Sequence, residues 1–476
     1  MNQRTENPGL RGGYYAACLR KTAPLWAASG LLALLCTLIS YPGIWYSDSY
    51  VRVATGNAVL NAVIQALKGH PITLETGNAF TVVPSFFIAL CLGLTGQPAL
   101  YTFCQAFFFF AAVFLLIRDI APGREKTQTV LFALSPLVWG ASVYCEANIG
   151  SVIGLIALVL LFRRLPVKKN RGVRAAEFLL IALSSLVTFG YRTNALTVLP
   201  VLGVYIWKTR QAWKDRLRPL LAVLCGLVIM VALPRVFGIR SQSNAGTGFV
   251  WEMITVIQRL PPEDRETYLD YLDDIGGEGA TRAVVASSTE ASANDFMWGS
   301  AINLNKLSAP GTMGRVLTKY LRMLREKPLE CLRVKADFVL RAMGIPEALN
   351  TSEYDYNRWD AMGEYGFNDS RQRHFFHSSF LRFHAALSFY TLRPWVPFLL
   401  SLILLLAERR RKSRNAGLYT LLFWLAAFYY CAYLTVIVGF ELRFFYPALL
   451  LLSILDCAVL LDWARDGWHY LMKKKG

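Results

Sequence analysis

Residues 80–96 read FTVVPSFFIALCLGLTG, and the interpretation of this apolar stretch decides the topology of the whole chain. It is shorter than the roughly 20 residues that cross a bilayer, it contains Pro84, and it runs into the turn sequence TGQP. Counting it as a membrane span would place every later basic loop on the wrong side. We therefore expect a re-entrant or interfacial helix here.

The composition around this stretch is that of a polytopic membrane protein. Of 476 residues, 54% are hydrophobic and 17% charged, and the mean hydropathy is +0.36. No cleavable signal peptide is evident, because the first apolar run lacks an A-x-A-like site, so we expect the N-terminus to be retained. The net charge of +18 lies mostly in short basic blocks between apolar runs, so no nucleic-acid partner is expected.

Apolar runs predict about ten transmembrane helices in an all-α protein. They cover residues 24–44, 99–117, 127–144, 149–162, 177–190, 194–208, 219–235, 394–407, 416–438 and 444–462. These runs look nearly free of charge. If 80–96 does not cross, both termini and every basic block face the cytosol, as the excess of Lys and Arg in cytosolic loops requires.

This topology divides the chain into three parts. Residues 1–235 form an N-terminal transmembrane module with a first outer loop at 45–98, and residues 236–392 form a mostly helical outer domain. Residues 393–476 supply the last transmembrane helices and a basic cytosolic tail. In the first loop, apolar residues recur with helical spacing, so Ser49 to Lys68 is predicted to form an amphipathic helix along the membrane.

Asp48 is the acid of YPGIWYSDSY, residues 41–50, which follows the first predicted span. One interpretation is a helix N-cap beside an aromatic belt. The other is a catalytic carboxylate at the outer face, because an acid in a partly dehydrated setting can act as general base for a hydroxyl. The two roles are compatible.

Four further residues are candidates at the same face. Glu146 in YCEANIG could be a second acid for an acceptor or metal, or part of an interfacial turn. Arg192 in FGYRTNAL and Arg443 in ELRFFYP are cations at outer ends of spans, where a guanidinium could bind a lipid phosphate. The alternatives are ordinary headgroup contact or an ion pair of Arg443 with Glu441. His70 in GHP could contact substrate or lie in a loop turn.

The sequence supports a metal site less than it supports the acidic and arginine candidates. His374, His377 and His384 have rough helical spacing, but no cysteine or dense set of acids accompanies them, so we assign no metal ligands, although a divalent cation is possible. The segment 354–376 interleaves aromatic, amide and charged side chains, a pattern that fits either contacts with sugar rings or a mobile polar loop. Walker-type, G-x-G-x-x-G and G-x-S-x-G motifs are absent from the sequence.

The quoted motifs resemble those of the GT-C superfamily of integral-membrane glycosyltransferases, which includes protein O-mannosyltransferases, aminoarabinose transferases and O-antigen glucosyltransferases. The resemblance rests on YPGIWYSDSY, GHP, YRTNAL and ELRFFYP. It implies a polyprenyl-phosphate-linked sugar donor, Asp48 as catalytic base, and Arg443 and Arg192 near the donor phosphate. Glu146 corresponds to the second acid. The single acid in SDS differs from the adjacent pair of many relatives.

The function expected from the resemblance is transfer of a sugar from a polyprenyl phosphate to a hydroxyl of a cell-envelope glycan, lipid or protein. A polymerase or ligase using a diphosphate-linked donor, a transporter or flippase of lipid-linked glycans, and a non-catalytic scaffold are the alternatives. Short loops favour a bacterial inner membrane with a periplasmic active face. NTS at Asn350 and NDS at Asn368 would be glycosylation sites if the loop were lumenal.

Overall fold

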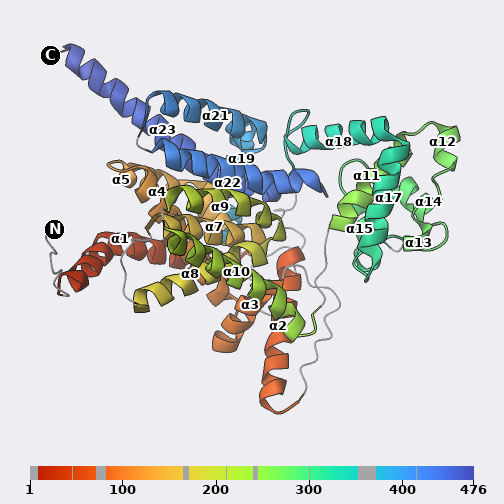
Figure 1. Cartoon of the computed structure of the whole chain (residues 1–476), viewed down its shortest axis with the longest axis horizontal. Helices are drawn as coiled ribbons and strands as arrows, with labels where there is room; N and C mark the ends of the chain where they lie inside the picture. Colours follow the sequence, from red (N-terminus) through yellow and green to blue (C-terminus); the bar gives the residue numbers. More distant parts are fainter. Residues whose placement is uncertain are drawn as a thin grey trace.

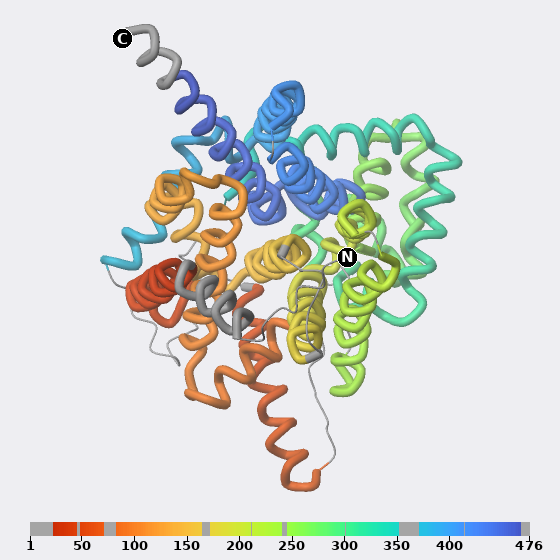
Figure 2. The backbone as a smooth tube through the Cα atoms, turned by 60° about the vertical axis from the view of Figure 1, so that its left-hand side comes forward, coloured from red at the N-terminus to blue at the C-terminus, as the bar shows by residue number. Residues whose placement is uncertain are grey.

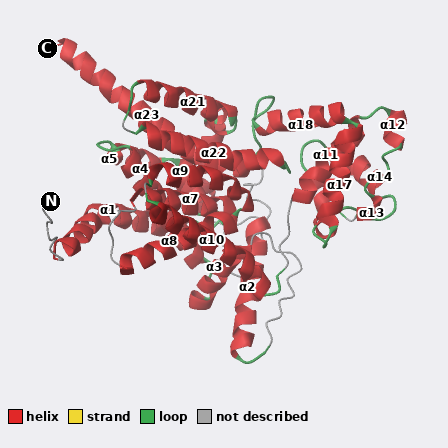
Figure 3. Ribbon diagram, viewed as in Figure 1, coloured by secondary structure: helices red, strands yellow, loops and turns green. Residues whose placement is uncertain are grey.

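The computed structural model describes most of the chain as helices joined by short connections (Figures 1 and 3). The described residues are 9–44, 47–70, 82–164, 171–210, 212–239, 245–299, 301–351, 371–413 and 415–475. Within these ranges there is no β-strand, and extended pairing is limited to isolated bridges. The all-α fold class is therefore confirmed.

Six described helices contain segments long and apolar enough to cross a membrane. These segments are Thr22–Ile39 of α1, Ala99–Ile120 of α4, Gly172–Tyr191 of α8, Trp213–Val236 of α10, Ala416–Thr435 of α22 and Leu442–Gly467 of α23. Their parent helices are α1 (Gly9–Ile39), α4 (Ala99–Ile120), α8 (Arg171–Tyr191), α10 (Trp213–Val236), α22 (Ala416–Thr435) and α23 (Leu442–Lys475). The length and composition of these six segments thus indicate an integral membrane protein. We call the helices that pack around these segments the bundle.

The bundle has a buried centre and an apolar perimeter. α4, α7 (Ala147–Arg164) and α23 lie at the centre, where long runs of aliphatic and aromatic side chains are buried. α1, α8 and α10 lie towards the outside of the bundle (Figure 2). They expose many leucines, including Leu35, Leu179 and Leu224. Such a surface would be costly in water, whereas lipid chains cover it without penalty.

Two predicted spans differ from single α-helices. Residues 127–144 form α5 (Glu125–Leu134) and α6 (Pro136–Ser142), because Pro136 cannot continue the preceding helix and Ser135 Oγ caps α6 by accepting the Leu137 N–H at 3.3 Å. Residues 194–208 begin as a 3₁₀ turn, η1 (Thr193–Val198), and continue as α9 (Leu199–Thr209). The prediction of one continuous helix is wrong for both segments.

The first loop contains two helices that pack on each other. α2 (Ser47–Leu67) coincides in sequence with the helix predicted at Ser49 to Lys68 and projects sideways from the bundle (Figures 1 and 2). α3 (Val82–Thr95) covers the described part of the stretch at 80–96; its 14 residues are too few to cross a bilayer. It packs on α2, α8 and α4, and so lies against the bundle.

A second group of helices lies beyond one end of the bundle (Figure 1). It contains α11 (Ala245–Arg259), α12 (Pro262–Glu266), α13 (Asp273–Gly276), α14 (Ala280–Ser287), α15 (Asn294–Met297), α16 (Leu304–Leu307), α17 (Thr312–Glu326) and α18 (Pro328–Ala342). We call this group the outer group and the adjacent end of the bundle the domain end. α1 begins and α23 ends at the opposite, termini end (Figure 1).

Three helices lead back from the outer group into the bundle: α19 (Arg371–Ala386), α20 (Ser388–Thr391) and α21 (Trp395–Arg410). α19 packs mainly on α6, and α21 packs on α22 and α23. The predicted segment 236–392 therefore contains both the outer group and helices that pack on the membrane bundle.

Helices α7 and α8 pack closely enough for a single substitution to test the fold. A Cβ on Gly154 of α7 would lie 2.5 Å from Thr188 Oγ1 and 2.7 Å from Ser184 O of α8. We expect Gly154→Ala to force the helices apart and to reduce the free energy of unfolding by about 1–3 kcal/mol. The midpoint of thermal unfolding of the purified protein measures this.

Gly203→Ala on α9 is the matched control, because a Cβ there meets nothing within 4 Å. Alanine should be neutral or slightly stabilising at that position. Equal midpoints for the two variants would contradict the close α7–α8 contact.

Candidate functional site

Asp48 lies in the first turn of α2, at the domain end of the bundle. Its Oδ2 is 3.3 Å from Arg443 Nη1 and 3.5 Å from Arg52 Nη2. The Asp48 side chain keeps 18% of its surface exposed, whereas Arg52 is buried. Asp48 is therefore a partly accessible acid held between two cations.

Backbone and side-chain hydrogen bonds fix the start of α2 against the connection between α6 and α7. Ile44 N–H donates to Val143 O at 3.0 Å, and Cys145 N–H donates to Ile44 O at 3.3 Å. The same Cys145 carbonyl accepts from Ser49 Oγ at 2.7 Å and from Arg52 Nη1 at 2.9 Å. Asp48 is consequently anchored beside the residue that precedes Glu146.

The chain before α2 is held by side chains from distant helices. Arg373 of α19 donates to the carbonyls of Tyr41 and Gly43 at 2.9 and 2.6 Å. Thr102 of α4 donates to Pro42 O at 2.7 Å. These bonds satisfy backbone carbonyls and orient the first loop, so the position of Asp48 depends on tertiary contacts.

Glu146 is almost fully buried, with 1% of its surface exposed, and forms an ion pair with Arg192 at 2.9 Å. Its second oxygen accepts the Asn148 N–H at 2.9 Å. Burial raises the pKa of Glu146, but the Arg192 guanidinium, Arg52 and Arg443 lower it more, so the pKa lies below the usual range. Glu146 is thus a stable anion that balances nearby arginines.

Arg443 joins the two acids that flank it. Its Nε donates to Glu441 Oε2 at 2.5 Å, and its Nη1 is the group that contacts Asp48. The guanidinium carbons of Arg443 and Arg192 lie 4.9 and 5.7 Å from the centre of the Phe444 ring. Both arginines therefore flank one aromatic ring, and the ion pairs form one cluster.

This cluster, which we call the charge cluster, comprises Asp48, Arg52, Glu146, Arg192, Glu441 and Arg443. It combines three acids with three guanidiniums from α2, the α6–α7 connection, the end of α8, and the start of α23. The ion pair of Arg443 with Glu441, one of the alternatives at the sequence level, is present. Arg443 nevertheless also contacts Asp48, so it links two carboxylates.

The outer group docks on the segment that carries Glu441. Ala293 N–H donates to Val438 O at 3.1 Å, Asn350 N–H donates to Phe440 O at 2.8 Å, and Leu442 N–H donates to Asn350 O at 2.9 Å. Trp251 of α11 packs on Phe440, with ring centres 5.5 Å apart. The outer group therefore fixes the backbone that presents Arg443.

His70 is the predicted site residue that the structure does not bring to the cluster. It is exposed and follows the C-terminal end of α2, more than five helical turns after Asp48. At 1.5 Å per residue the two lie about 30 Å apart. Asp48, Glu146, Arg192 and Arg443 do come together.

Two members of the charge cluster were not proposed as site residues from the sequence. Arg52 follows Asp48 by one helical turn, and this i,i+4 spacing is a signal that could have identified it. Glu441 was considered only as an ion-pair partner. The α23 span also contains a buried acid, Asp456, which accepts hydrogen bonds from Ser401 Oγ at 2.5 Å and Tyr390 OH at 2.7 Å. The expectation of nearly charge-free spans is wrong there.

The histidines of α19 lie in different surroundings. His377 pairs with Tyr144 OH at 2.6 Å, His384 is buried against the rings of Phe380 and Phe383, and His374 is exposed. Among the described residues, no group of three or more His, Cys, Asp or Glu side chains is arranged to hold a metal ion. Residues 354–370 of the proposed sugar-contacting segment lie outside the described residues.

Comparisons with protein families, curated proteins and solved structures found no match to this chain. The resemblance to the GT-C superfamily therefore rests on the short sequence motifs.

Glu146→Gln tests whether the charge cluster is a mutually stabilised unit. Removing the anion leaves Arg192 poorly compensated, so we expect a loss of about 2–4 kcal/mol in the free energy of unfolding. The control is Glu330→Gln, whose partner Arg333 is mostly exposed, with an expected change within about 0.5 kcal/mol.

The lowered pKa of Glu146 also predicts how the stability difference between the wild type and Glu146→Gln depends on pH. Because the folded-state pKa of Glu146 is lowered, its stabilisation is fully present above the ordinary glutamate pKa and is lost as the pH falls toward the folded-state value. Unfolding midpoints measured from pH 8 to pH 4 should show a constant gap between the wild type and Glu146→Gln, narrowing only at the acidic end. A gap that widens with acid would refute this assignment.

Proposed function

We propose that this protein is a membrane glycosyltransferase that moves a sugar from a polyprenyl-phosphate donor to an acceptor hydroxyl at the domain end of the bundle. The single observation that carries the proposal is the contact of Asp48 with Arg443 across 395 residues of sequence. This reaction needs a general base for the acceptor and a cation for the departing phosphate within reach of the same bound sugar.

Asp48 is the proposed base. As the acceptor oxygen forms its bond to the anomeric carbon of the sugar, the bond from that carbon to the phosphate oxygen breaks and its electron pair leaves with the phosphate. The acceptor proton passes to the Asp48 carboxylate. Partial exposure supports this role, because a base must reach a hydroxyl in the site.

Arg443 and Arg192 are the proposed partners of the departing phosphate. Arg443 contacts Glu441 at 2.5 Å and Asp48 at 3.3 Å, so the Asp48 contact is the weaker one and the one that an incoming phosphate would replace. Glu441 would then keep the guanidinium oriented while its terminal nitrogens bind phosphate oxygens. Arg192, whose guanidinium lies 5.7 Å from the centre of the same Phe444 ring, adds a second cation.

Three features make the domain end suitable for such a donor. A lipid-linked sugar needs access from the bilayer, and the apolar bundle supplies that setting. Glu146 and Arg52 balance charge deeper in the site. The outer group adjoins the cluster through residues 437–442 and could shape the acceptor site.

We place this face in the periplasm of a bacterial inner membrane, with both termini cytosolic and lipids as neighbours.

One observation favours a second class of function. Asp456 is an ionisable group inside a membrane helix, and such groups often mark transport pathways. Its two hydrogen bonds tie together α20, α21 and α23, which is also a structural role. A transporter would depend on Asp456 and not on the Asp48 carboxylate as a base.

Asp48→Asn is the variant that tests the proposed base. We expect transfer from a panel of synthetic polyprenyl-phosphate hexoses and pentoses, with a detergent extract of the source membranes as acceptor, to fall by about 10²–10⁴-fold. Protein abundance in the membrane should stay unchanged. Donor consumption and labelled product are the readouts.

Asp215→Asn is the matched control, because Asp215 also lies in the first turn of a helix, α10, but at the termini end. It separates the loss of a base from the loss of a helix N-terminal charge. Equal transfer by the wild type and Asp48→Asn would overturn the proposed mechanism. Translocation of a lipid-linked glycan that requires Asp456, without labelled transfer product, would favour the transporter.

A further inference from the structure

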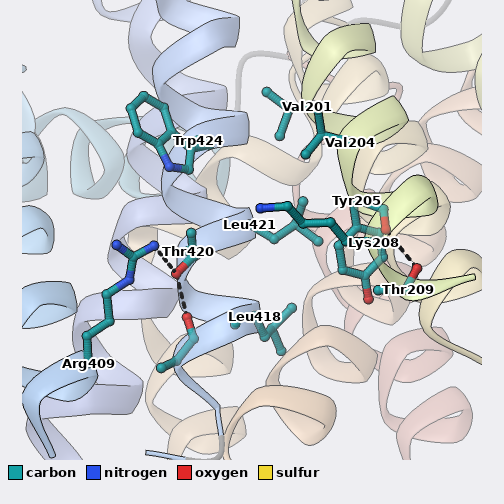
Figure 4. A pocket seen from close by; sticks show the side chains of 12 residues that line it. Val201, Val204, Tyr205, Lys208, Thr209, Arg409, Leu418, Thr420, Leu421 and Trp424 are labelled. Carbon is teal, nitrogen blue, oxygen red and sulfur yellow. Dashed lines mark hydrogen bonds between the residues drawn. The ribbon is translucent and has the colours of Figure 1, made fainter. Parts of the chain in front are cut away.

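An open pocket of about 660 Å³ lies between α9 and α22, at the termini end of the bundle (Figure 4). Its walls are largely apolar and include Val201, Val204, Leu421 and Trp424. Two cations, Lys208 and Arg409, also line it. The pocket therefore combines an apolar surface with positive charge.

The two cations are available to a ligand from the membrane. Both side chains are exposed, and Figure 4 shows the Lys208 ammonium reaching across the pocket toward α22. Arg409 donates to Thr420 Oγ1 at 3.2 Å. Across the described parts of the chain, neither cation forms an ion pair with an acid, so the protein leaves their charge uncompensated there.

Neighbouring aromatic side chains place these cations at the depth of lipid headgroups. Trp207, adjacent to Lys208, and Trp213 at the start of α10 are both exposed, and their rings meet edge to face at 5.9 Å. Arg216 lies over the Trp207 ring at 4.2 Å. Exposed tryptophans with nearby basic residues are typical of a membrane–water interface.

The residues of α22 that line the pocket extend from Ala416 to Trp424. Thr197 Oγ1 donates to Phe428 O at 2.7 Å and joins η1 to α22 one turn beyond Trp424. From Ala416 to Trp424 the α22 wall is about 12 Å long. This length suits the first part of an acyl chain, whereas a long polyprenyl tail would have to leave the pocket sideways.

We propose that this pocket binds one anionic glycerophospholipid, with its phosphate between Lys208 and Arg409 and an acyl chain against Val204, Leu421 and Trp424. Charge complementarity selects the anionic headgroup, and the apolar wall of the pocket accepts the chain. The site lies at the opposite end of α22 from the charge cluster, so it is separate from the proposed donor site. It does not depend on the proposed glycosyltransferase activity.

Lipid retention by the purified full-length protein tests this proposal. The protein is placed in nanodiscs of equimolar phosphatidylglycerol and phosphatidylcholine, released, and analysed by native mass spectrometry. The wild type should retain phosphatidylglycerol preferentially. The double variant Lys208→Gln/Arg409→Gln should retain roughly 20-fold less, because two cationic contacts are lost.

Two controls separate the pocket from general surface charge and from misfolding. Lys214→Gln/Arg410→Gln removes two exposed cations at the same end and should retain lipid as the wild type does. Val204→Trp should fill the pocket and reduce retention, whereas Val228→Trp on the exposed face of α10 should not. Thermal unfolding midpoints verify that the variants fold.

Three outcomes would overturn the proposal. The first is equal phosphatidylglycerol retention by the two double variants. The second is equal retention of phosphatidylglycerol and phosphatidylcholine by the wild type. The third is displacement of phosphatidylglycerol from the wild type by equimolar polyprenyl phosphate, with retention of the polyprenyl phosphate lost in Lys208→Gln/Arg409→Gln. That result would assign the pocket to the carrier lipid.

Discussion

The contact between Asp48 and Arg443 joins the two distant parts of the chain that form the candidate site. Asp48 belongs to the first helix after the first span, and Arg443 to the first turn of the last helix. Their meeting requires that α2 be anchored on the α6–α7 connection and that α23 start beside it. Charged groups this little exposed are stable only when they are paired, so the folded bundle and the ion pairs depend on each other.

The outer group is coupled to the same point. Hydrogen bonds from Ala293 and Asn350 hold the chain around Phe440, directly before the residues that carry Glu441 and Arg443. A change in the outer group would therefore move the guanidinium that contacts Asp48. The outer group and the residues that carry the charge cluster are therefore linked directly through the backbone around Phe440.

The sequence predicted the parts of this fold that arise from local physical chemistry. Helical spacing of apolar residues located α2, and apolar length located the segments of α4, α22 and α23. The break at Pro136 and the 3₁₀ start of the segment at 194–208 were missed because hydropathy alone ignores local backbone constraints. In the site, aromatic and motif context predicted Asp48 and Arg443 as partners at one face.

The remaining features depend on long-range packing that no local pattern encodes. The docking of Asn350 on Phe440 and the clamp of Arg373 on the first loop join residues far apart in sequence. The helix spacing of Arg52 from Asp48 was readable, but its burial against Cys145 was not. His70 is the opposite case: it belongs to the same first loop as Asp48, but helix α2 separates the two residues in space.

The most direct test of the central claim is identification of the lipid that co-purifies with the protein through Arg443. Lipids extracted from the wild type and from Arg443→Gln, with exposed Arg282→Gln as control, are compared by mass spectrometry. The account predicts a polyprenyl-phosphate-linked sugar in the wild type and in Arg282→Gln, and its loss from Arg443→Gln. Absence of such a lipid from the wild type, or equal amounts in all three proteins, would contradict the claim that the charge cluster binds a lipid-linked donor phosphate.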